Sequence, residues 1–199
     1  MATIEVGTGP DILGDTAGDD LVLGFAGNDR LITRRGIDTL DGSSGDDTLA
    51  IDWSDAPQDA TVLGYFSVAH LNTDGTNDWR TSTRRAEHVR VEHFDVVTGR
   101  GDDYLFGKEG NADTLDGGAG VDGWGDRFDN GGAPEALVID MAQVQTPQGL
   151  TLPEDSEARN LEYADLVLSD FDDVFRDSGP YNDTVAGAGG NDDLGSSLG

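Results

Sequence analysis

Aliphatic residues recur every nine positions over the first fifty residues, and each stands two positions after an aspartate. The aliphatic residues are Leu13, Val22, Leu31, Leu40 and Leu49. The aspartates are Asp11, Asp20, Asp29, Asp38 and Asp47, and the glycines two positions before them are Gly9, Gly18, Gly27, Gly36 and Gly45. The chain therefore opens with a strict Gly-x-Asp-x-aliphatic repeat.

Glycine at a fixed offset indicates a tight turn, because glycine adopts positive φ without steric cost. The aliphatic residue indicates a short strand whose alternate side chains point inward. Turns alternating with short strands predict a flattened coil of two nonapeptides per revolution. Aspartates eighteen residues apart then stack at about 4.8 Å, the spacing between neighbouring strands.

Stacked carboxylates repel one another unless a cation lies between them. A ligand set made only of carboxylate and carbonyl oxygens, in a chain without cysteine, favours calcium over zinc. We expect about five to seven calcium ions. The paired carboxylates are Asp11/Asp29, Asp20/Asp38, Asp29/Asp47, Asp103/Asp122 and Asp173/Asp192.

The fullest glycine turns are Gly117-Gly118-Ala119-Gly120-Val121-Asp122 and Gly187-Ala188-Gly189-Gly190-Asn191-Asp192. These turns resemble the RTX, or hemolysin-type, calcium-binding repeat, whose consensus is Gly-Gly-x-Gly-x-Asp-x-aliphatic-x. The resemblance implies a parallel β-roll in which aspartates and turn carbonyls hold calcium. The turn before Asp38 departs from the consensus, with Thr33-Arg34-Arg35 where two glycines are expected.

Sliding the sequence by seventy residues reveals an internal duplication. Asp95, Asp103, Asp113 and Asp122 fall on Asp165, Asp173, Asp183 and Asp192. We expect Asp95 to stack on Asp113, and Asp165 on Asp183, at the eighteen-residue distance. These eight aspartates and the five of the N-terminal repeat are candidate calcium ligands. The candidate ligand glycines are Gly9, Gly18, Gly27, Gly36, Gly45, Gly101, Gly120 and Gly190.

The predicted fold is an all-β parallel β-roll with two lateral β-rich insertions, in one continuous domain. Repeat blocks cover 1–49, 92–122 and 162–199, and the insertions cover 50–91 and 123–161. Within the first insertion we expect strands at 60–68 and 89–91, with a hairpin turn at Asn72-Thr73-Asp74-Gly75 between them. No helical pattern of ten or more residues is present.

Forty acidic residues against twelve basic ones give a net charge of −28, which argues against a nucleic-acid partner. Such a chain tends toward disorder without a cation. No apolar run is long enough for a transmembrane segment, and the N-terminus is not a cleavable signal peptide. The resemblance implies an extracellular or cell-surface protein leaving the cell by type I export. The last six residues show no recognisable export signal, so the chain is either a fragment or carries an unusual signal.

Other motifs have ordinary explanations. The stretch 72–78 resembles an EF-hand loop but lacks its final glutamate, and the three histidines share no zinc motif. Arg100-Gly101-Asp102 spells an adhesion tripeptide inside a glycine turn. The basic cluster Arg80, Arg84, Arg85 and Arg90 either neutralises nearby carboxylates or contacts an anionic polysaccharide or a neighbouring subunit. We expect Trp53 and Trp79 to cover the open sides of the roll, and Trp124 to lie in its core.

No nucleophile or phosphate-binding loop has a recognisable setting, so we predict that the chain is not an enzyme. The sequence favours a secreted protein that folds on extracellular calcium and has a structural or interaction role. Two forms of that role stay open. Repeat blocks at both termini allow head-to-tail assembly into a filament or surface layer. Alternatively, the chain is an accessory or adhesion module of a larger secreted enzyme or adhesin.

Overall fold

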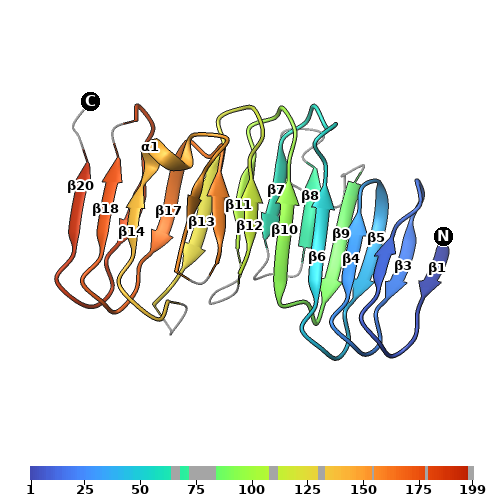
Figure 1. Cartoon of the computed structure of the whole chain (residues 1–199). Coiled ribbons are helices and arrows are strands. Elements are labelled where there is room, and N and C mark those ends of the chain that lie inside the picture. Colours follow the sequence, from blue (N-terminus) through green and yellow to red (C-terminus); the bar gives the residue numbers. More distant parts are fainter. Residues whose placement is uncertain are drawn as a thin grey trace.

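The computed structural model describes residues 1–63, 68–71, 84–107, 112–129, 133–153, 155–177 and 179–196. Short strands stack side by side along one axis, from β1 at the N-terminal end to β20 at the C-terminal end (Figure 1). Nearly all strand pairs are parallel. The predicted all-β parallel β-roll is confirmed.

Across the described residues, three sheets make up the roll. Sheet one has the order β1 (Ala2–Glu5), β3 (Asp20–Leu23), β5 (Gly36–Asp41), β9 (Arg84–Val89), β8 (Val68–Leu71), β7 (Ala60–Leu63), β11 (Tyr104–Phe106), β13 (Gly123–Arg127), β17 (Tyr163–Val167) and β19 (Thr184–Ala186). Sheet two has the order β15 (Leu150–Thr151), β16 (Glu157–Arg159), β12 (Thr114–Asp116), β10 (His93–Val97), β6 (Thr48–Asp52), β4 (Arg30–Thr33) and β2 (Ile12–Gly14). Sheet three contains β14 (Val138–Asp140), β18 (Val174–Asp177) and β20 (Asp193–Ser196), and the short helix α1 (Met141–Val144) follows β14.

The repeat leucines and valine fill the space between the sheets. Leu31, Leu40 and Leu49 have no exposed surface, and Val22 is equally buried. Trp124 is 1% exposed, as predicted for a core residue. Trp53 is also fully buried, so our expectation that it covers an open side of the roll is wrong. Its indole adds apolar area to a core that also contains Trp124 and Phe94 among the aliphatic side chains.

The two edges of the roll are formed by its turns. The first edge carries the turns from sheet one to sheet two, at 6–11, 24–29, 42–47 and 90–92. The second edge carries the return turns to sheet one, at 15–19, 34–35, 53–59, 98–103, 117–122 and 160–162. In the N-terminal block each repeat aspartate lies at the end of one of these turns or, for Asp20 and Asp38, within the first three residues of the strand that follows. The coil therefore places successive aspartates alternately on the two edges.

The segments predicted as lateral insertions are instead part of the sheets. In the first segment, β9 pairs with β5 and β7 pairs with β11, so its strands continue sheet one. In the second segment, β13 pairs with β11 and β17, while β16 extends sheet two. Stacking on the roll satisfies the backbone groups that a lateral strand would leave to water.

Two strand predictions in the first segment are wrong. The stretch 60–68 is not a single strand, because β7 and β8 run antiparallel with Leu63 opposite Val68. The strand predicted at 89–91 ends at Val89, since Arg90 has a φ of 52° and leaves the extended conformation. The predicted hairpin turn at 72–75 lies outside the described residues.

The duplicated blocks have a register of nineteen residues, not eighteen. Asp95 lies opposite Thr114 and Asp165 opposite Thr184, so neither stacks on the aspartate we predicted. The additional residue places Asp113 beside Phe94, whose N–H donates to Asp113 Oδ1 at 2.8 Å. Asp95 and Asp165 consequently lie within strands and not at the ends of turns.

The third glycine of each turn packs against the main chain of the preceding coil. Gly45, with a φ of 149°, leaves no room for a Cβ beside the carbonyl of Gly27, and a Cβ on Gly27 would lie 2.6 Å from the carbonyl oxygen of Gly9. The same approach joins Gly36 to Gly18, Gly120 to Gly101, and Gly190 to Phe171. All eight glycines named as candidate ligand positions thus belong to contacts between neighbouring turns.

Gly45→Ala is expected to destabilise the calcium-loaded protein by about 2 kcal/mol or more, because the new Cβ must displace main chain and adopt an unfavourable φ. Urea unfolding in saturating calcium measures the change. Gly14→Ala is the control, since nothing lies within 4 Å of its Cβ position. That variant should change stability by no more than about 1 kcal/mol. Equal midpoints for the two variants would contradict the packing argument.

Candidate calcium-binding turns

Repeat aspartates on each edge are joined by a hydrogen-bonded ladder. The N–H of one aspartate donates to Oδ1 of the aspartate in the next coil, as from Asp29 to Asp47 at 2.8 Å. The same bond joins Asp11 to Asp29, Asp20 to Asp38, Asp103 to Asp122, and Asp173 to Asp192, at 2.8 to 3.0 Å. The structure therefore brings together all five of the carboxylate pairs predicted from spacing.

Two glutamates continue the ladder where the nonapeptide is interrupted. Glu92 Oε2 accepts the N–H of Asp47 at 3.1 Å, and Glu162 Oε2 accepts the N–H of Asp122 at 2.8 Å. Neither glutamate is among the calcium ligands expected from the sequence. Their signal was present, because the two glutamates superpose under the seventy-residue shift.

The second oxygen of several ladder carboxylates has no hydrogen-bond donor. The Oδ2 atoms of Asp29, Asp47, Asp103 and Asp122 are buried and unpaired, and these residues are at most 2% exposed. A buried carboxylate oxygen without a partner costs several kcal/mol. Such atoms occur in native proteins where an ion or water completes the environment.

Main-chain carbonyls lie beside these oxygens. A Cβ on Gly24 would lie 2.6 Å from Asp29 Oδ2 and 2.9 Å from the carbonyl oxygen of Gly42, the first glycine of the next turn on that edge. Gly42 is flanked in the same way by Asp47 Oδ2, at 2.5 Å from the Cβ position, and by the carbonyl of Arg90. Glycine leaves this cradle open, whereas any side chain would fill it.

The second edge repeats the arrangement at Gly117. Its Cβ position is 2.8 Å from Asp122 Oδ2 and also close to the carbonyl of Asn160. Asn160 and Arg90, seventy residues apart, both have a φ of 52°. Carboxylate and carbonyl oxygens are the donors that calcium prefers, so these turns fit that ion. Among the described residues no three acidic or histidine side chains form a metal cluster, so carbonyls must supply much of any ligand shell.

Burial raises the pKa of several ladder carboxyls. The pKa of Asp122 rises to about 8 through burial and the nearby charges of Asp103 and Glu162, against the opposing hydrogen bond from the N–H of Asp103. Burial also raises the pKa of Asp47, aided by the charges of Asp29 and Glu92. For Asp103 burial raises the pKa to about 6. The ionised forms therefore lack a counter-charge, which a bound cation would supply.

Other predicted ligands have different surroundings. Asp95 forms an ion pair with Arg30, and Asp165 accepts a hydrogen bond from the Tyr104 hydroxyl at 3.2 Å. Asp183 is half-buried on the second edge, where Oδ1 accepts the N–H of Ala164 at 2.8 Å. Both oxygens of Asp173 contact the Ser169 hydroxyl. Asp95 and Asp165 are therefore not brought to the turns, whereas Asp173 and Asp183 are.

Asp113 lies on the first edge beside Asp126, a second acid that was not expected from the sequence. Asp126 Oδ2 and Asp113 Oδ2 lie 2.7 and 3.0 Å from the Cβ position of Gly107. Both residues are buried, at 5% and 2% exposure. Asp126 follows Gly125, and the sequence around it gives no repeat signal, so only the fold reveals this pair.

The basic cluster neutralises carboxylates where it is described. Arg84 pairs with Asp55 at 2.5 Å, Arg85 with Glu87 at 3.2 Å, and Arg90 with Asp41. Arg80 lies outside the described residues. His88 packs edge-on against Phe94 with ring centroids 4.9 Å apart, and His93 Nε2 lies 2.8 Å from Asp46. These contacts favour the first of the two roles considered for the arginines.

Comparison with known protein families agrees with this geometry. The model of the RTX calcium-binding nonapeptide repeat matches four times, over residues 5–40, 23–50, 95–123 and 177–199. The chain belongs to the RTX calcium-binding nonapeptide repeat family. RTX repeats bind calcium, and they are typical of extracellular proteins secreted by the type I route. The repeat is a structural calcium-binding unit and not a catalytic one.

The RTX matches cover both edges of the N-terminal block and the turns that end at Asp103, Asp113 and Asp122. They do not include Asp165 or Asp173, although the ladder continues through Asp173. No curated protein matches the chain at significant similarity. No helix among the described residues is long and apolar enough to cross a membrane.

Proposed function

We propose that this RTX protein is a secreted, non-catalytic structural or interaction protein whose roll folds when its turns bind extracellular calcium. The observation that carries the proposal is the set of four buried carboxylate oxygens without donors, on Asp29, Asp47, Asp103 and Asp122. Each belongs to a repeat turn and would be compensated by a divalent cation. Folding and binding are coupled, because the sites do not exist in the unfolded chain.

Three glycine cradles define the proposed ligand groups. At Gly24 the ligands are Asp29 Oδ2 and the carbonyl of Gly42, and at Gly42 they are Asp47 Oδ2 and the carbonyl of Arg90. At Gly117 they are Asp122 Oδ2 and the carbonyl of Asn160. Bound calcium would supply positive charge between neighbouring turns. The ladder bonds hold the carboxylates in place for it through their Oδ1 atoms.

Export and calcium supply agree with this role. Free calcium is scarce inside cells, so the chain would stay expanded during type I export. It would fold outside, where calcium is abundant enough to fill extracellular sites of modest affinity. No cysteine is present, so disulfides cannot stabilise the exported chain. Calcium would take over that stabilising role.

Isothermal titration of the metal-free protein with calcium tests the proposal. We expect saturable binding of several ions with a simultaneous rise of the β-sheet signal in circular dichroism. Magnesium is the control, because it demands octahedral geometry and retains its waters. Absence of calcium binding, or equal binding of magnesium, would reject calcium-coupled folding.

Head-to-tail assembly is a second candidate, and the end strands favour it. Within the described residues, β1 and β19 are the outermost strands of sheet one, β2 is outermost in sheet two, and β20 is outermost in sheet three. A second copy could pair its β1 with β19 and its β2 with β20, which continues the parallel stacking. Such a contact is heterologous and does not close, so it would produce filaments. A longer polypeptide could cover the same strand edges in place of a second copy.

Light scattering during calcium addition, followed by electron microscopy, separates these outcomes. Growth in particle size with linear particles supports assembly. Dispersed monomers at high calcium and high protein concentration would reject it and would favour the role of a module within a larger protein. Thr3→Pro removes an N–H from the outermost strand β1 and should block growth. A substitution in β3, such as at Leu21, would not test the contact, because β3 is an internal strand.

A further inference from the structure

The two edges of the N-terminal block differ in how they satisfy the second oxygen of each aspartate. On the first edge, Asp29 Oδ2 and Asp47 Oδ2 are buried without a donor. On the second edge, the Thr16 hydroxyl donates to Asp20 Oδ2 at 2.7 Å, and the Thr33 hydroxyl donates to Asp38 Oδ2 at 2.6 Å. The same carboxylate oxygen is therefore open on one edge and closed on the other.

At Asp38 this difference follows from one position in the repeat, whereas the donor to Asp20 is Thr16, four residues before it. Five residues before the aspartate, the first edge has Gly24 and Gly42, and the carboxylate faces a carbonyl across an open cradle. At the same offset from Asp38 the second edge has Thr33, which is 1% exposed. A threonine carries the hydroxyl that glycine lacks, and a buried hydroxyl must use its proton in a hydrogen bond.

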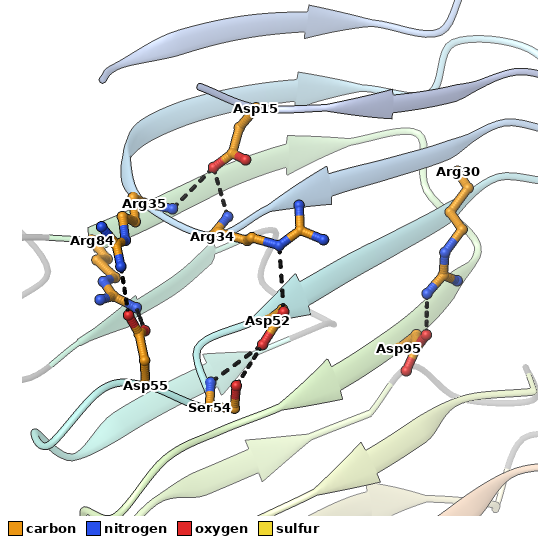
Figure 2. A network of polar contacts seen from close by, with 9 residues as sticks. All are labelled: Asp15, Arg30, Arg34, Arg35, Asp52, Ser54, Asp55, Arg84 and Asp95. Carbon is orange, nitrogen blue, oxygen red and sulfur yellow. Dashed lines mark hydrogen bonds and ion pairs between the residues drawn. The ribbon is translucent and has the colours of Figure 1, made fainter. Parts of the chain in front are cut away.

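Arginine also occupies the second edge. Figure 2 shows Arg34 directed toward Asp52 while Arg35 and Arg84 converge on Asp55. Arg35 donates to Asp55 at 2.8 Å, and Arg84 donates to it at 2.5 Å. The backbone N–H groups of Arg34 and Arg35 both donate to Asp15 Oδ2, at 2.6 and 2.9 Å. The carboxylates of this edge therefore already have cationic or N–H partners.

A guanidinium in a turn acts against a divalent cation in two ways. It repels the ion, and it removes the negative charge that would attract the ion. The Thr33-Arg34-Arg35 turn combines both effects with a hydroxyl on the remaining oxygen of Asp38. On this edge hydroxyls satisfy the second oxygens of Asp20 and Asp38, and arginines bring positive charge to the neighbouring Asp52 and Asp55.

We propose that calcium binding in the N-terminal block is confined to the first edge, and that the second edge at Asp20 and Asp38 closes without metal. This inference rests on the proposed function and assigns its ions to particular turns. It departs from our expectation that Asp20 and Asp38 form a calcium pair. The second edge becomes a metal-independent seam along which the first coils can hold together.

Asp47→Asn and Asp38→Asn form a matched pair that tests the assignment. Asparagine keeps an Oδ1 to accept the ladder N–H of Asp29 or Asp20, and it removes the charge. Native mass spectrometry in saturating calcium counts the bound ions, and circular dichroism verifies the fold. We expect Asp47→Asn to lose at least one ion and Asp38→Asn to keep the wild-type count. A loss in Asp38→Asn equal to that in Asp47→Asn would overturn the inference, whereas a wild-type chain that binds no calcium would overturn the proposed function.

The double variant Thr33→Gly with Arg34→Gly provides a test that does not depend on losing a ligand. It restores both glycines at the start of the turn before Asp38 and frees Asp38 Oδ2. We expect at least one additional bound calcium per chain. An unchanged count in a folded variant would overturn the inference, because the hydroxyl and the guanidinium would then not be what excludes the ion.

Discussion

Removing calcium with EDTA at pH 7.5 is expected to unfold the roll and to expand the chain. A net charge of −28 on 199 residues opposes compaction, and the buried carboxylates of Asp29, Asp47, Asp103 and Asp122 lose their counter-charge. Small-angle X-ray scattering should show a radius of gyration approaching roughly 48 Å, the value for an unfolded chain of this length. Circular dichroism should show loss of the β-sheet signal, and both changes should reverse when calcium is restored.

Salt separates specific binding from general screening of charge. Sodium chloride at about 1 M reduces the Debye length to roughly 3 Å, and it should suppress repulsion without occupying the turns. We expect high salt to compact the metal-free chain only partly, without restoring the β-sheet signal. Full refolding by salt alone, or a compact roll that persists with no bound calcium, would contradict the coupling of folding to calcium.

The nonapeptide period was sufficient to predict the roll and its core. At fixed offsets in the repeat, the glycine forms the turn, the aspartate closes it and the aliphatic residue packs inward, and each of these roles is local. Because these roles are local, the structure agrees with them: Leu31 and Leu40 are buried, and Asp29 is hydrogen-bonded to Asp47 of the next coil on the same edge. The five aspartate pairs predicted within the glycine turns are joined by ladder hydrogen bonds. The stacking predicted for Asp95 on Asp113 and for Asp165 on Asp183 was wrong.

What the sequence did not reveal depends on partners far along the chain. Glu92 completes a ladder begun at Asp47, and only its match to Glu162 seventy residues away, not any local pattern, distinguishes it from a surface glutamate. Asp95 belongs to the duplication but lies within a strand, because the coil there contains nineteen residues. The antiparallel strand β8 joins the sheet between β7 and β9, and its place depends on which neighbours are available to pair.

The different surroundings of the turns also depend on position in the fold. Thr33 and Arg34 are departures from the consensus in the sequence, yet only the structure shows that the hydroxyl reaches Asp38 and the guanidinium reaches Asp52. The departure from the consensus at Thr33 therefore supplies Asp38 Oδ2 with a donor from within the chain.

Acidification is expected to stabilise the metal-free roll, the opposite of the usual effect of acid on a protein. Burial raises the pKa of Asp122 to about 8, and of Asp38, Asp103 and Asp183 to about 6, from an unfolded value of 3.8. A carboxyl with a higher pKa in the folded state binds its proton more tightly there, so protonation favours folding. The stability that this contributes is present at low pH and is lost as pH rises from about 4 to about 8.

Circular dichroism and scattering in EDTA between pH 8 and pH 5 measure this effect. The β-sheet signal should rise as pH falls, since protons replace calcium in removing charge from the buried carboxyls. Asp122→Asn is the informative variant, because it removes the carboxyl with the highest pKa and keeps an oxygen to accept the N–H of Asp103. Its metal-free form should be more folded than the wild type at pH 7 to 8, with the difference narrowing toward pH 5. Unfolding of the metal-free wild type as pH falls through this range would show that the buried carboxyls are not what destabilises it.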